Sequence, residues 1–312
     1  MAHAIQDVTG MKAKSRKQGL ISYKATRRLT PLFFVTPATL LFCVLMLFPM
    51  VMVVRYSLMD GAIVTENAGF AGLQNYRAVF ADPVFWESVA NTLYFTVMSV
   101  IFHLLIGLAF AMLLNSQRVN PVLRSILRVL FILPWLFTAV IIAVIWRLLL
   151  DPNGVINSVL MTLHIVGFKV EWFSSPATAL HAVTFVNIWA GYPLYMVSLL
   201  AGLQGISQDL YEAAGIDGAN EWEKFRYITI PQLMPIIISI ALLDFIWTMQ
   251  VFPLVWMTTG GGPIHATEML STYTYKLAFR EYDFSLASAS AILILILSMS
   301  VTYFYIKHQK AR

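Results

Sequence analysis

The hydrophobic residues of this chain gather in long runs that short polar segments separate. One helix needs about 20 predominantly apolar residues to cross a bilayer core. Six runs are long enough, and they cover residues 31–54, 91–114, 128–150, 178–202, 232–257 and 284–306. Prolines stand at the ends of these runs or part-way through them, as membrane helices tolerate. The pattern therefore predicts an all-α polytopic membrane protein, a helical bundle with six transmembrane helices.

The segments between the predicted spans are short and rich in turn signals. Asp151-Pro152-Asn153-Gly154 follows the third span, and Gly260-Gly261-Gly262-Pro263 follows the fifth. Residues 73–90 are expected to form a short amphipathic helix that leads into the second span. None of the segments is long enough for a separate domain. The chain is therefore expected to have a tail over 1–28, one transmembrane domain over 29–306, and a second tail over 307–312.

Composition supports the membrane assignment. The chain is 59% hydrophobic and only 12% charged, whereas soluble domains carry about 25% charged residues. Its net charge of +5 comes from basic residues spread among the polar segments, not from a basic patch with interleaved aromatics. No nucleic-acid partner is therefore expected. Cys43, the single cysteine, excludes an internal disulfide and a cysteine-based metal cluster.

The basic residues also predict an orientation. With the N-terminus inside, fifteen Lys and Arg residues fall on the cytoplasmic side of the six spans and six fall on the opposite side. Cytoplasmic loops carry the excess of positive charge. Both termini are therefore expected in the cytoplasm. The first thirty residues are polar and basic, and the run after them is too long for a signal-peptide core, so a retained first span is expected.

Residues 203–231, between the fourth and fifth spans, predict a helix–turn–helix on the cytoplasmic side. Ser207 is placed to cap the first helix. Asp217-Gly218 is a turn signal, because glycine accepts the left-handed backbone that ends a helix. A second short helix is expected from about Glu221 to Ile228, and Pro231 is expected to open the next span.

This segment exposes apolar and small side chains where a loop should face water. They are Tyr211, Ala213, Ala214, Ile216, Trp222 and Phe225. An exposed apolar patch of this kind marks a partner interface. The alternative is that the patch packs on lipid headgroups or on the helix ends of the same chain.

The same segment resembles the EAA signature of binding-protein-dependent ABC importer permeases. That signature reads Glu-Ala-Ala, three residues, Gly, nine residues, Ile, one residue, Leu-Pro. The chain matches it with Glu212-Ala213-Ala214, Gly218, Ile228 and Ile230-Pro231, with isoleucine in place of leucine at 230. Softer matches resemble the sugar-permease, maltose-transporter-like branch: Gly72-Leu73-Gln74-Asn75-Tyr76, Asn91-Thr92, Leu133-Pro134-Trp135 and Thr259-Gly260-Gly261-Gly262-Pro263.

The resemblance implies a type I ABC importer permease fold and a channel-forming subunit that moves a carbohydrate across a bacterial inner membrane. It implies a second homologous permease, two cytoplasmic ATPase subunits and an extracytoplasmic solute-binding protein as partners, besides membrane lipid. The EAA segment would be a coupling helix that docks on the ATPase. The implied coupling residues are Tyr211, Glu212, Ala213, Ala214, Asp217 and Gly218.

No catalytic or cofactor-binding set accompanies these motifs. The chain has no Gly-x-x-x-x-Gly-Lys-Ser/Thr loop, so ATP and magnesium would be bound by the partner ATPase. His103 and His181 lack another histidine or cysteine at ligand spacing, so no metal site is predicted. Arg147 and Trp146 are interpreted as anchors at the outer interface. We therefore expect a transport subunit without a cofactor of its own, and not an enzyme.

Asp244 is a carboxylate in the middle of the fifth predicted span. At a helix centre such a group costs about 2.5–3.5 kcal/mol on insertion scales, so it needs a partner or a wet cavity. Trp247, Thr248 and Val251 follow at helical spacing and are expected to share its face. On the fourth span Asn187, Gly191 and Leu194 are the facing candidates. A carboxylate beside an indole ring suits a sugar, so these seven residues are the predicted substrate-binding set.

Three alternatives remain open. Asp244 could instead be a structural hydrogen-bond partner to a neighbouring helix or to the second permease. The same machinery could carry a sugar phosphate or another small polar solute, which would favour Arg or Lys facing the cavity. An ion-coupled secondary transporter with Asp244 as its proton carrier would not explain the EAA segment, and ATP-dependent uptake would exclude it.

Overall fold

A computed structural model describes residues 34–65 and 68–309, and it divides the chain into two units at Tyr56–Ser57. The first unit is built on one helix, which begins at Phe34 and ends at Ser57. A π-helical turn, η1 (Cys43–Leu47), runs into α2 (Phe48–Ser57). The side chains of this helix are mostly exposed. The first predicted span is therefore confirmed from Phe34 onward, while its first three residues and the tail over 1–28 lie outside the described residues.

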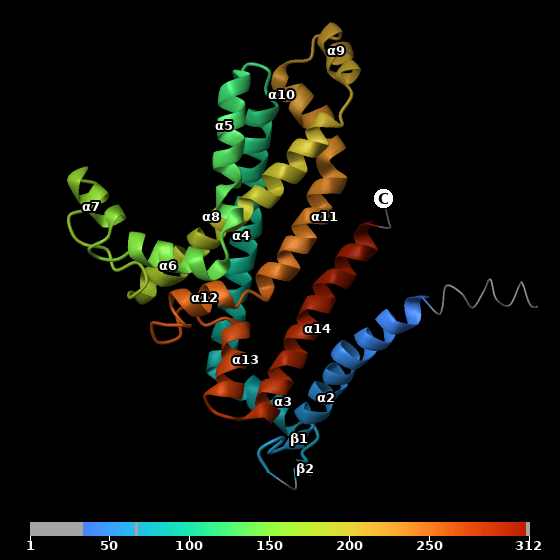
Figure 1. The fold of residues 1–312 in the computed structure, drawn as a ribbon, viewed down its shortest axis with the longest axis vertical. Helices are drawn as coiled ribbons and strands as arrows, with labels where there is room; N and C mark the ends of the chain where they lie inside the picture. The colour runs from blue at the N-terminus through green and yellow to red at the C-terminus, as the bar shows by residue number, and fades with distance from the viewer. Residues whose placement is uncertain (1–33, 66–67, 310–312) are drawn as a thin grey trace, which may run out of the picture. The chain divides into compact units, whose positions relative to one another are not determined.

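Long helices form the body of the second unit (Figure 1). They are α4 (Pro83–Asn115), α8 (Pro176–Gln204), α11 (Ile230–Met249) and α14 (Phe284–Gln309). Counted over both units, the described residues contain four helices that are long and apolar enough to cross a membrane, or five if a bent helix pair is counted as one span. The apolar helix 284–300, within α14, is shorter. Each predicted span thus has a helix or a bent pair at its place.

The core of this unit lies where α4 packs against α8. Gly107 of α4 allows the two backbones to approach closely, because a Cβ there would lie 2.4 Å from the Cβ of Tyr195. Small residues at helix contacts serve this purpose in membrane bundles. Around the contact, Leu114, Met196 and Leu199 are buried together with Leu233 of α11. The α4–α8 pair is therefore the main helix contact of this unit, and α11 packs against both of its helices.

The third predicted span, over 128–150, is not one continuous helix. Its residues form α5 (Pro121–Ile132), a 3₁₀ turn η2 (Leu133–Leu136) and α6 (Ala139–Leu149), and the axis bends by 103° between η2 and α6. Pro134 lies in the 3₁₀ turn, and Phe137 is extended. The Thr138 hydroxyl then accepts a hydrogen bond from the backbone of Ile141 and begins a new helix.

The predicted bounds of the fifth span are wrong at both ends. The helix stops at Met249, and α12 (Pro253–Thr258) begins after a break, since proline cannot donate to the preceding turn. At the other end Pro231 does not open a new helix. One continuous helix runs from Glu221 to Met249 through α10 (Glu221–Lys224), the π-turn η3 (Phe225–Thr229) and α11.

The amphipathic helix predicted over 73–90 is two helices. The first, α3, covers Gln74–Ala81 and ends at Asp82, whose carboxylate accepts from the Val84 backbone at 2.9 Å and caps α4. Pro83 occupies the first turn of α4, where its missing N–H costs nothing. Residues 83–90 therefore belong to the second long helix.

The connecting segments carry the remaining short elements. These are the antiparallel strands β1 (Met59–Asp60) and β2 (Gly69–Phe70), and the helices α7 (Val155–Thr162), α9 (Gln208–Ile216) and α13 (Leu270–Phe279). Within the ranges that the structure covers, β1 and β2 are the only strands. The predicted all-α class is confirmed apart from this two-residue ladder.

Candidate functional site

The segment over 203–231 forms the predicted helix–turn–helix. The Ser207 hydroxyl accepts a hydrogen bond from the Asp209 backbone at 3.3 Å and caps α9. Gly218 ends the turn with φ of +84°, and the space around its Cα is open, so backbone conformation alone requires glycine there. Asn220 and Glu223 form a capping box that begins α10. The predicted cap and left-handed glycine are confirmed.

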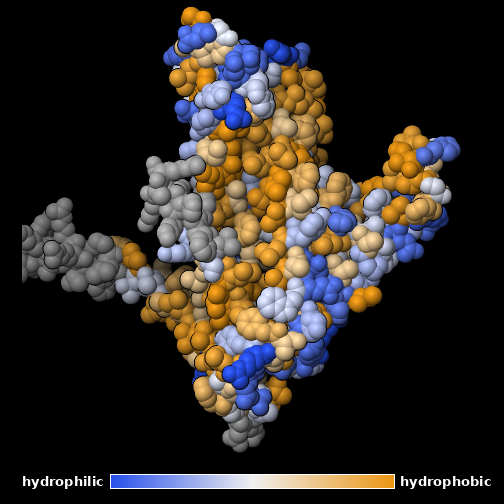
Figure 2. Space-filling model, turned by 180° about the vertical axis from the view of Figure 1, so that it is seen from behind, coloured by the Kyte–Doolittle hydropathy of each residue, from blue (hydrophilic) through white to orange (hydrophobic). Residues whose placement is uncertain are grey.

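Side chains of this segment divide between an outer and an inner face. Glu212, Ala213, Asp217 and Gly218 are exposed, and Ala214 is half-buried. Ile216, in contrast to an ordinary buried isoleucine, is 87% exposed. Figure 2 shows hydrophilic and hydrophobic residues mixed at this end of the unit. Trp222, in the helix after the turn, is 65% exposed, so the segment carries more than one exposed large apolar side chain.

Tyr211 belongs to the inner face and ties α9 to the long helix below it. Its hydroxyl lies 2.9 Å from the hydroxyl of Thr229 in η3, and its ring packs against the α4–α8 core. Thr229 in turn donates to the carbonyl of Lys224 at 3.4 Å. These hydrogen bonds connect α9 to the continuous helix that carries Asp244.

Asp244 lies buried between three helices, with only 7% of its surface exposed. His103 of α4 places Nδ1 2.8 Å from its Oδ2, and the Tyr195 hydroxyl of α8 donates to the same oxygen at 3.0 Å. Its other oxygen accepts from the Thr248 hydroxyl at 3.0 Å. The carboxylate therefore joins α4, α8 and α11 at one point.

The second ring nitrogen of His103 fixes how many protons the cluster holds. Nε2 lies 2.9 Å from the backbone oxygen of Asn187, which can only accept. A neutral imidazole has one N–H. Either His103 is an imidazolium facing a carboxylate, or Asp244 is protonated and donates to Nδ1. In both states the pair is electrically neutral, which removes the cost of an isolated charge among apolar helices.

Four of the seven predicted substrate-site residues meet around His103. Asp244 and Thr248 lie on one side of its ring. Asn187 lies on the other side and also donates to the Ser99 hydroxyl at 2.9 Å. Gly191 faces the ring so closely that a Cβ there would lie 2.3 Å from it. Sequence reasoning missed His103 as the centre, although a mid-span carboxylate needs a partner and His103 is a polar group in a neighbouring span.

The other three predicted residues lie apart from this cluster. Trp247 is 60% exposed, in contrast to its buried neighbour Thr248. Leu194 of α8 is partly exposed. Val251 follows the end of α11 and packs among the residues around α6 and α12. The expectation that Val251 continues one helical stripe from Asp244 is therefore wrong, because the helix stops two residues before it.

A second buried charge, Glu268, lies under the glycine-rich segment after α12. Its carboxylate pairs with the Lys276 ammonium and accepts from the Thr272 hydroxyl at 2.7 Å. Gly261, at φ +91°, passes directly over it, and a Cβ there would lie 2.4 Å from Glu268 Oε2. Asn91 of α4 donates to the Glu268 carbonyl at 3.2 Å. The Gly-Gly-Gly-Pro segment is thus a cover for an ion pair that sequence reasoning did not identify.

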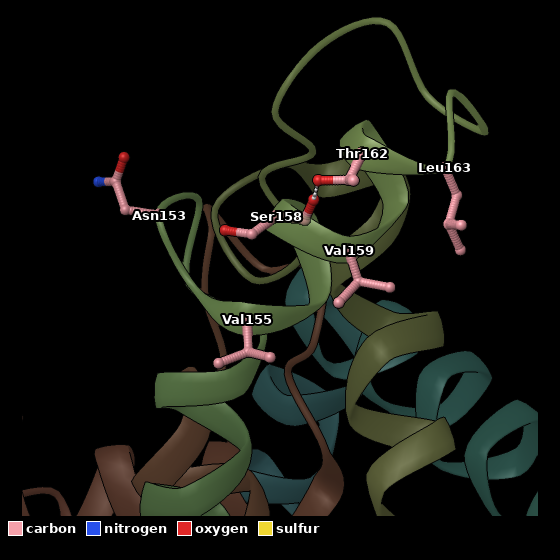
Figure 3. A pocket seen from close by; sticks show the side chains of 6 residues that line it. All are labelled: Asn153, Val155, Ser158, Val159, Thr162 and Leu163. Carbon is pink, nitrogen blue, oxygen red and sulfur yellow. Dashed lines mark hydrogen bonds between the residues drawn. The ribbon is translucent and has the colours of Figure 1, made fainter.

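Neither the histidines nor the pocket beside α7 supplies a further ligand site. Among the residues with described side chains, no three His, Cys, Asp or Glu groups meet to hold a metal. The pocket beside α7 has a volume of about 380 Å³ (Figure 3). Its polar side chains are already engaged: Ser158 and Thr162 donate to carbonyls of their own helix, and Asn153 accepts from Lys169. The pocket therefore does not indicate a polar ligand.

Similar proteins are found by sequence and by fold. Over 215 residues the chain is 38% identical to the trehalose/maltose transport system permease protein MalF of Thermococcus litoralis, which covers 69% of this chain and 70% of that one. Over 253 residues it is 35% identical to the lactose transport system permease protein LacF of Rhizobium radiobacter, covering 79% and 82%. A bacterial ABC transporter that imports the acidic polysaccharide alginate has the same fold, with a TM-score of 0.80 at 21% identity over 93% of this chain and 98% of that one.

The match to a family model covers the helices that build the described site. It extends over residues 103–312 and so includes His103, the helix–turn–helix over 203–231 and Asp244. The model describes the inner membrane component of binding-protein-dependent transport systems. Together with relatives above 30% identity over more than two thirds of the chain, it shows that this protein belongs to the family of binding-protein-dependent transport system inner membrane components.

Proposed function

We propose that this chain is the channel-forming permease subunit of an ATP-driven importer that takes a carbohydrate from a binding protein. The main supporting observation is the helix with Glu212-Ala213-Ala214, which is followed by Gly218 at φ +84°. It occurs in a chain that belongs to a family of inner membrane components. The carbohydrate cargo is supported by the names of relatives that transport maltose, trehalose and lactose. A sugar, an oligosaccharide, a polyol or a glycoside fits this proposal.

In the proposed assembly, ATP and magnesium are bound by two separate ATPase subunits, and this chain is not an enzyme. A second homologous permease and an extracytoplasmic solute-binding protein complete the importer. Support for the ATPase contact comes from the exposed Ile216 and the 65% exposed Trp222 at the same surface. Motion of the ATPase would reach the spanning helices through Tyr211 and Thr229, which lie 2.9 Å apart.

The helices around His103 are proposed to line the cargo path, with separate tasks for their side chains. Trp247 presents an exposed indole on which the apolar face of a sugar ring could stack, and Leu194 is partly open on α8. Asp244 and Thr248 are bonded to each other and to the neighbouring helices. We assign them, with Asn187 and Gly191, to positioning this surface, and Val251 to packing at its outer end.

Uptake by the reconstituted importer tests the class and the cargo together. The two permeases, the ATPase and the binding protein are placed in proteoliposomes, and accumulation of labelled maltose, trehalose and lactose is measured with and without ATP. ATP-dependent uptake of a carbohydrate is expected. Uptake that proceeds equally without ATP would refute an ABC importer, and ATP-dependent uptake of phosphate or an amino acid with no carbohydrate uptake would refute the cargo.

Trp247→Ala tests the cargo surface. Loss of one stacked aromatic is expected to raise the KM for uptake about tenfold, in line with about 1–2 kcal/mol for an aromatic contact. Trp86→Ala is the matched control, because Trp86 is also an exposed tryptophan, at 53%, but lies at the beginning of α4. Equal KM values for both variants and the unchanged importer would show that Trp247 does not contact cargo.

The proposed location is the bacterial inner membrane, with both termini in the cytoplasm. The supporting observation is the excess of Lys and Arg, fifteen against six, on the side assigned to the cytoplasm. Alkaline phosphatase fused after residue 165 is expected to be active, and the same enzyme fused after Arg312 is expected to be inactive. The reverse pattern would refute this orientation.

A further inference from the structure

A cavity of about 630 Å³ opens between the segment that joins α4 to α5 and the coupling helices. Its wall is built from the last turn of α4, the loop after it, α5, the end of α8, and α9, α10 and η3. Figure 1 shows α5, α9 and α10 together at the upper end of the unit. The cavity therefore lies where the long helices end, beside the segment proposed to contact the ATPase.

The charges on this cavity are predominantly positive. Arg118, Arg124 and Lys224 line it, against one carboxylate, Glu221. Three cations and one anion leave a formal net charge of +2. Glu221 lies 3.3 Å from Lys224, but its side chain is 85% exposed, whereas that of Lys224 is 19% exposed. The carboxylate thus points mainly to the outside, and the positive groups face the cavity.

Hydrogen bonds from one nitrogen hold the Arg124 guanidinium in place and leave other N–H groups without a partner in the described part of the chain. Its Nη2 donates to the carbonyls of Ser116 at 2.6 Å and Val119 at 3.2 Å, which fixes the guanidinium against the loop. Its Nε is buried and has no hydrogen-bond partner among the residues that the structure describes. An arginine so anchored is suited to bind phosphate oxygens.

The apolar part of the wall defines the kind of anion. Met112, Leu203 and Phe225 line the same cavity as the three cations. They stand at the ends of α4 and α8 and at the π-turn, where the apolar helices give way to polar loops. A phospholipid places its phosphate beside the boundary between hydrocarbon and water. We propose that this cavity binds the phosphate group of an anionic phospholipid and thereby links the α4–α5 loop to the coupling helices.

Lipid binding to the assembled importer, ATPase included, tests the proposal. Complexes in phosphatidylcholine nanodiscs are titrated with phosphatidylglycerol, and bound lipid is counted by native mass spectrometry. Arg118→Gln is the main variant, because no side-chain hydrogen bond of Arg118 is present within the described part of the chain. Arg128→Gln is the matched control: it removes the same charge from exposed α5 surface outside the cavity.

Arg118→Gln is expected to weaken phosphatidylglycerol binding about fivefold, the ratio that corresponds to about 1 kcal/mol per basic residue near an anionic surface. Arg128→Gln should leave it unchanged. Lys224→Gln, a second variant within the cavity, should weaken binding as Arg118→Gln does.

Three results would overturn the proposal. Equal weakening by Arg118→Gln and Arg128→Gln would show attraction to the surface in general. Displacement of the lipid by inorganic phosphate alone would assign the site to a free anion. Binding to the permease pair that disappears once the ATPase is present would show that ATPase side chains fill the cavity.

Discussion

The sharpest prediction concerns the bond between His103 and Asp244. Asp244→Asn keeps the shape of the side chain and one acceptor oxygen, which can still receive the Tyr195 hydroxyl. The amide cannot balance an imidazolium, so His103 becomes neutral and retains a single N–H. Its N–H can stay on Nε2 toward the Asn187 carbonyl, 2.9 Å away, while the amide at position 244 donates to Nδ1, so the contact of 2.8 Å is kept only as a neutral hydrogen bond.

The cost follows from the bond that is weakened. A hydrogen bond to a charged group contributes about 1.5–3 kcal/mol. A charge-assisted hydrogen bond is about twice as strong as a neutral one, so the exchange costs about 1 kcal/mol, and the variant is expected to melt about 2–4 °C below the unchanged importer. The maximal rate of uptake should fall with KM nearly unchanged, because the residue positions helices and does not hold the cargo.

A double-mutant cycle isolates this bond. His103→Gln, Asp244→Asn and the double variant are purified in the complete importer, and melting is followed by tryptophan fluorescence. Because each single change already removes the charge-assisted bond, the double variant should cost about 1 kcal/mol less than the sum of the two. Additive costs would refute the bond. A large rise in KM in Asp244→Asn, with melting unchanged, would refute the positioning role and favour direct contact with the cargo.

Three further predictions address the other constrained positions. Gly218→Val forces a β-branched residue to φ +84° and should abolish uptake while the protein still inserts. Asparagine tolerates that backbone, so Gly218→Asn should retain measurable uptake. Equal loss of uptake in both variants would contradict the argument from backbone conformation. Lys276→Met removes the ammonium partner of the buried Glu268 carboxylate and leaves it only His265 at 3.7 Å and the Thr272 hydroxyl. The loss is expected to cost about 3 kcal/mol, and a second change, Glu268→Gln, should recover most of the melting temperature. Asp82→Ala removes both the cap of α4 and the acceptor of the Tyr273 hydroxyl, so it should lower thermal stability by about 1–2 kcal/mol, and Asp82→Asn, which can still cap, by less.

Local signals in the sequence were sufficient to predict the helix–turn–helix over 203–231. The Ser207 cap and the left-handed Gly218 each depend on a few neighbouring residues, and both are present in the structure. The approximate places of the long helices could also be predicted, because a run of about 20 apolar residues has few alternatives in a bilayer. These features depend on a few neighbouring residues or on a long run of apolar residues, both of which can be read directly from the sequence.

Features that depend on tertiary contacts could not be predicted. Apolar residues on both sides of Pro134 look the same whether the chain runs straight or bends by 103°. The end of the fifth span at Met249 is set by a break before Pro253, and prolines elsewhere in the same helix cause no such break. A carboxylate in the middle of a span predicts a partner for Asp244, but this partner, His103, lies 141 residues earlier in the chain and could not be identified from the sequence.

The close contact between Gly191 and His103 constrains how this protein can evolve. A methyl group at position 191 would lie 2.3 Å from the imidazole ring, so that glycine can change only after the ring has gone. The ring in turn is a hydrogen-bond partner of Asp244 at 2.8 Å, so substitutions at positions 191, 103 and 244 are coupled to one another. In an alignment of descendants, a side chain at 191 together with histidine at 103 should be the missing combination.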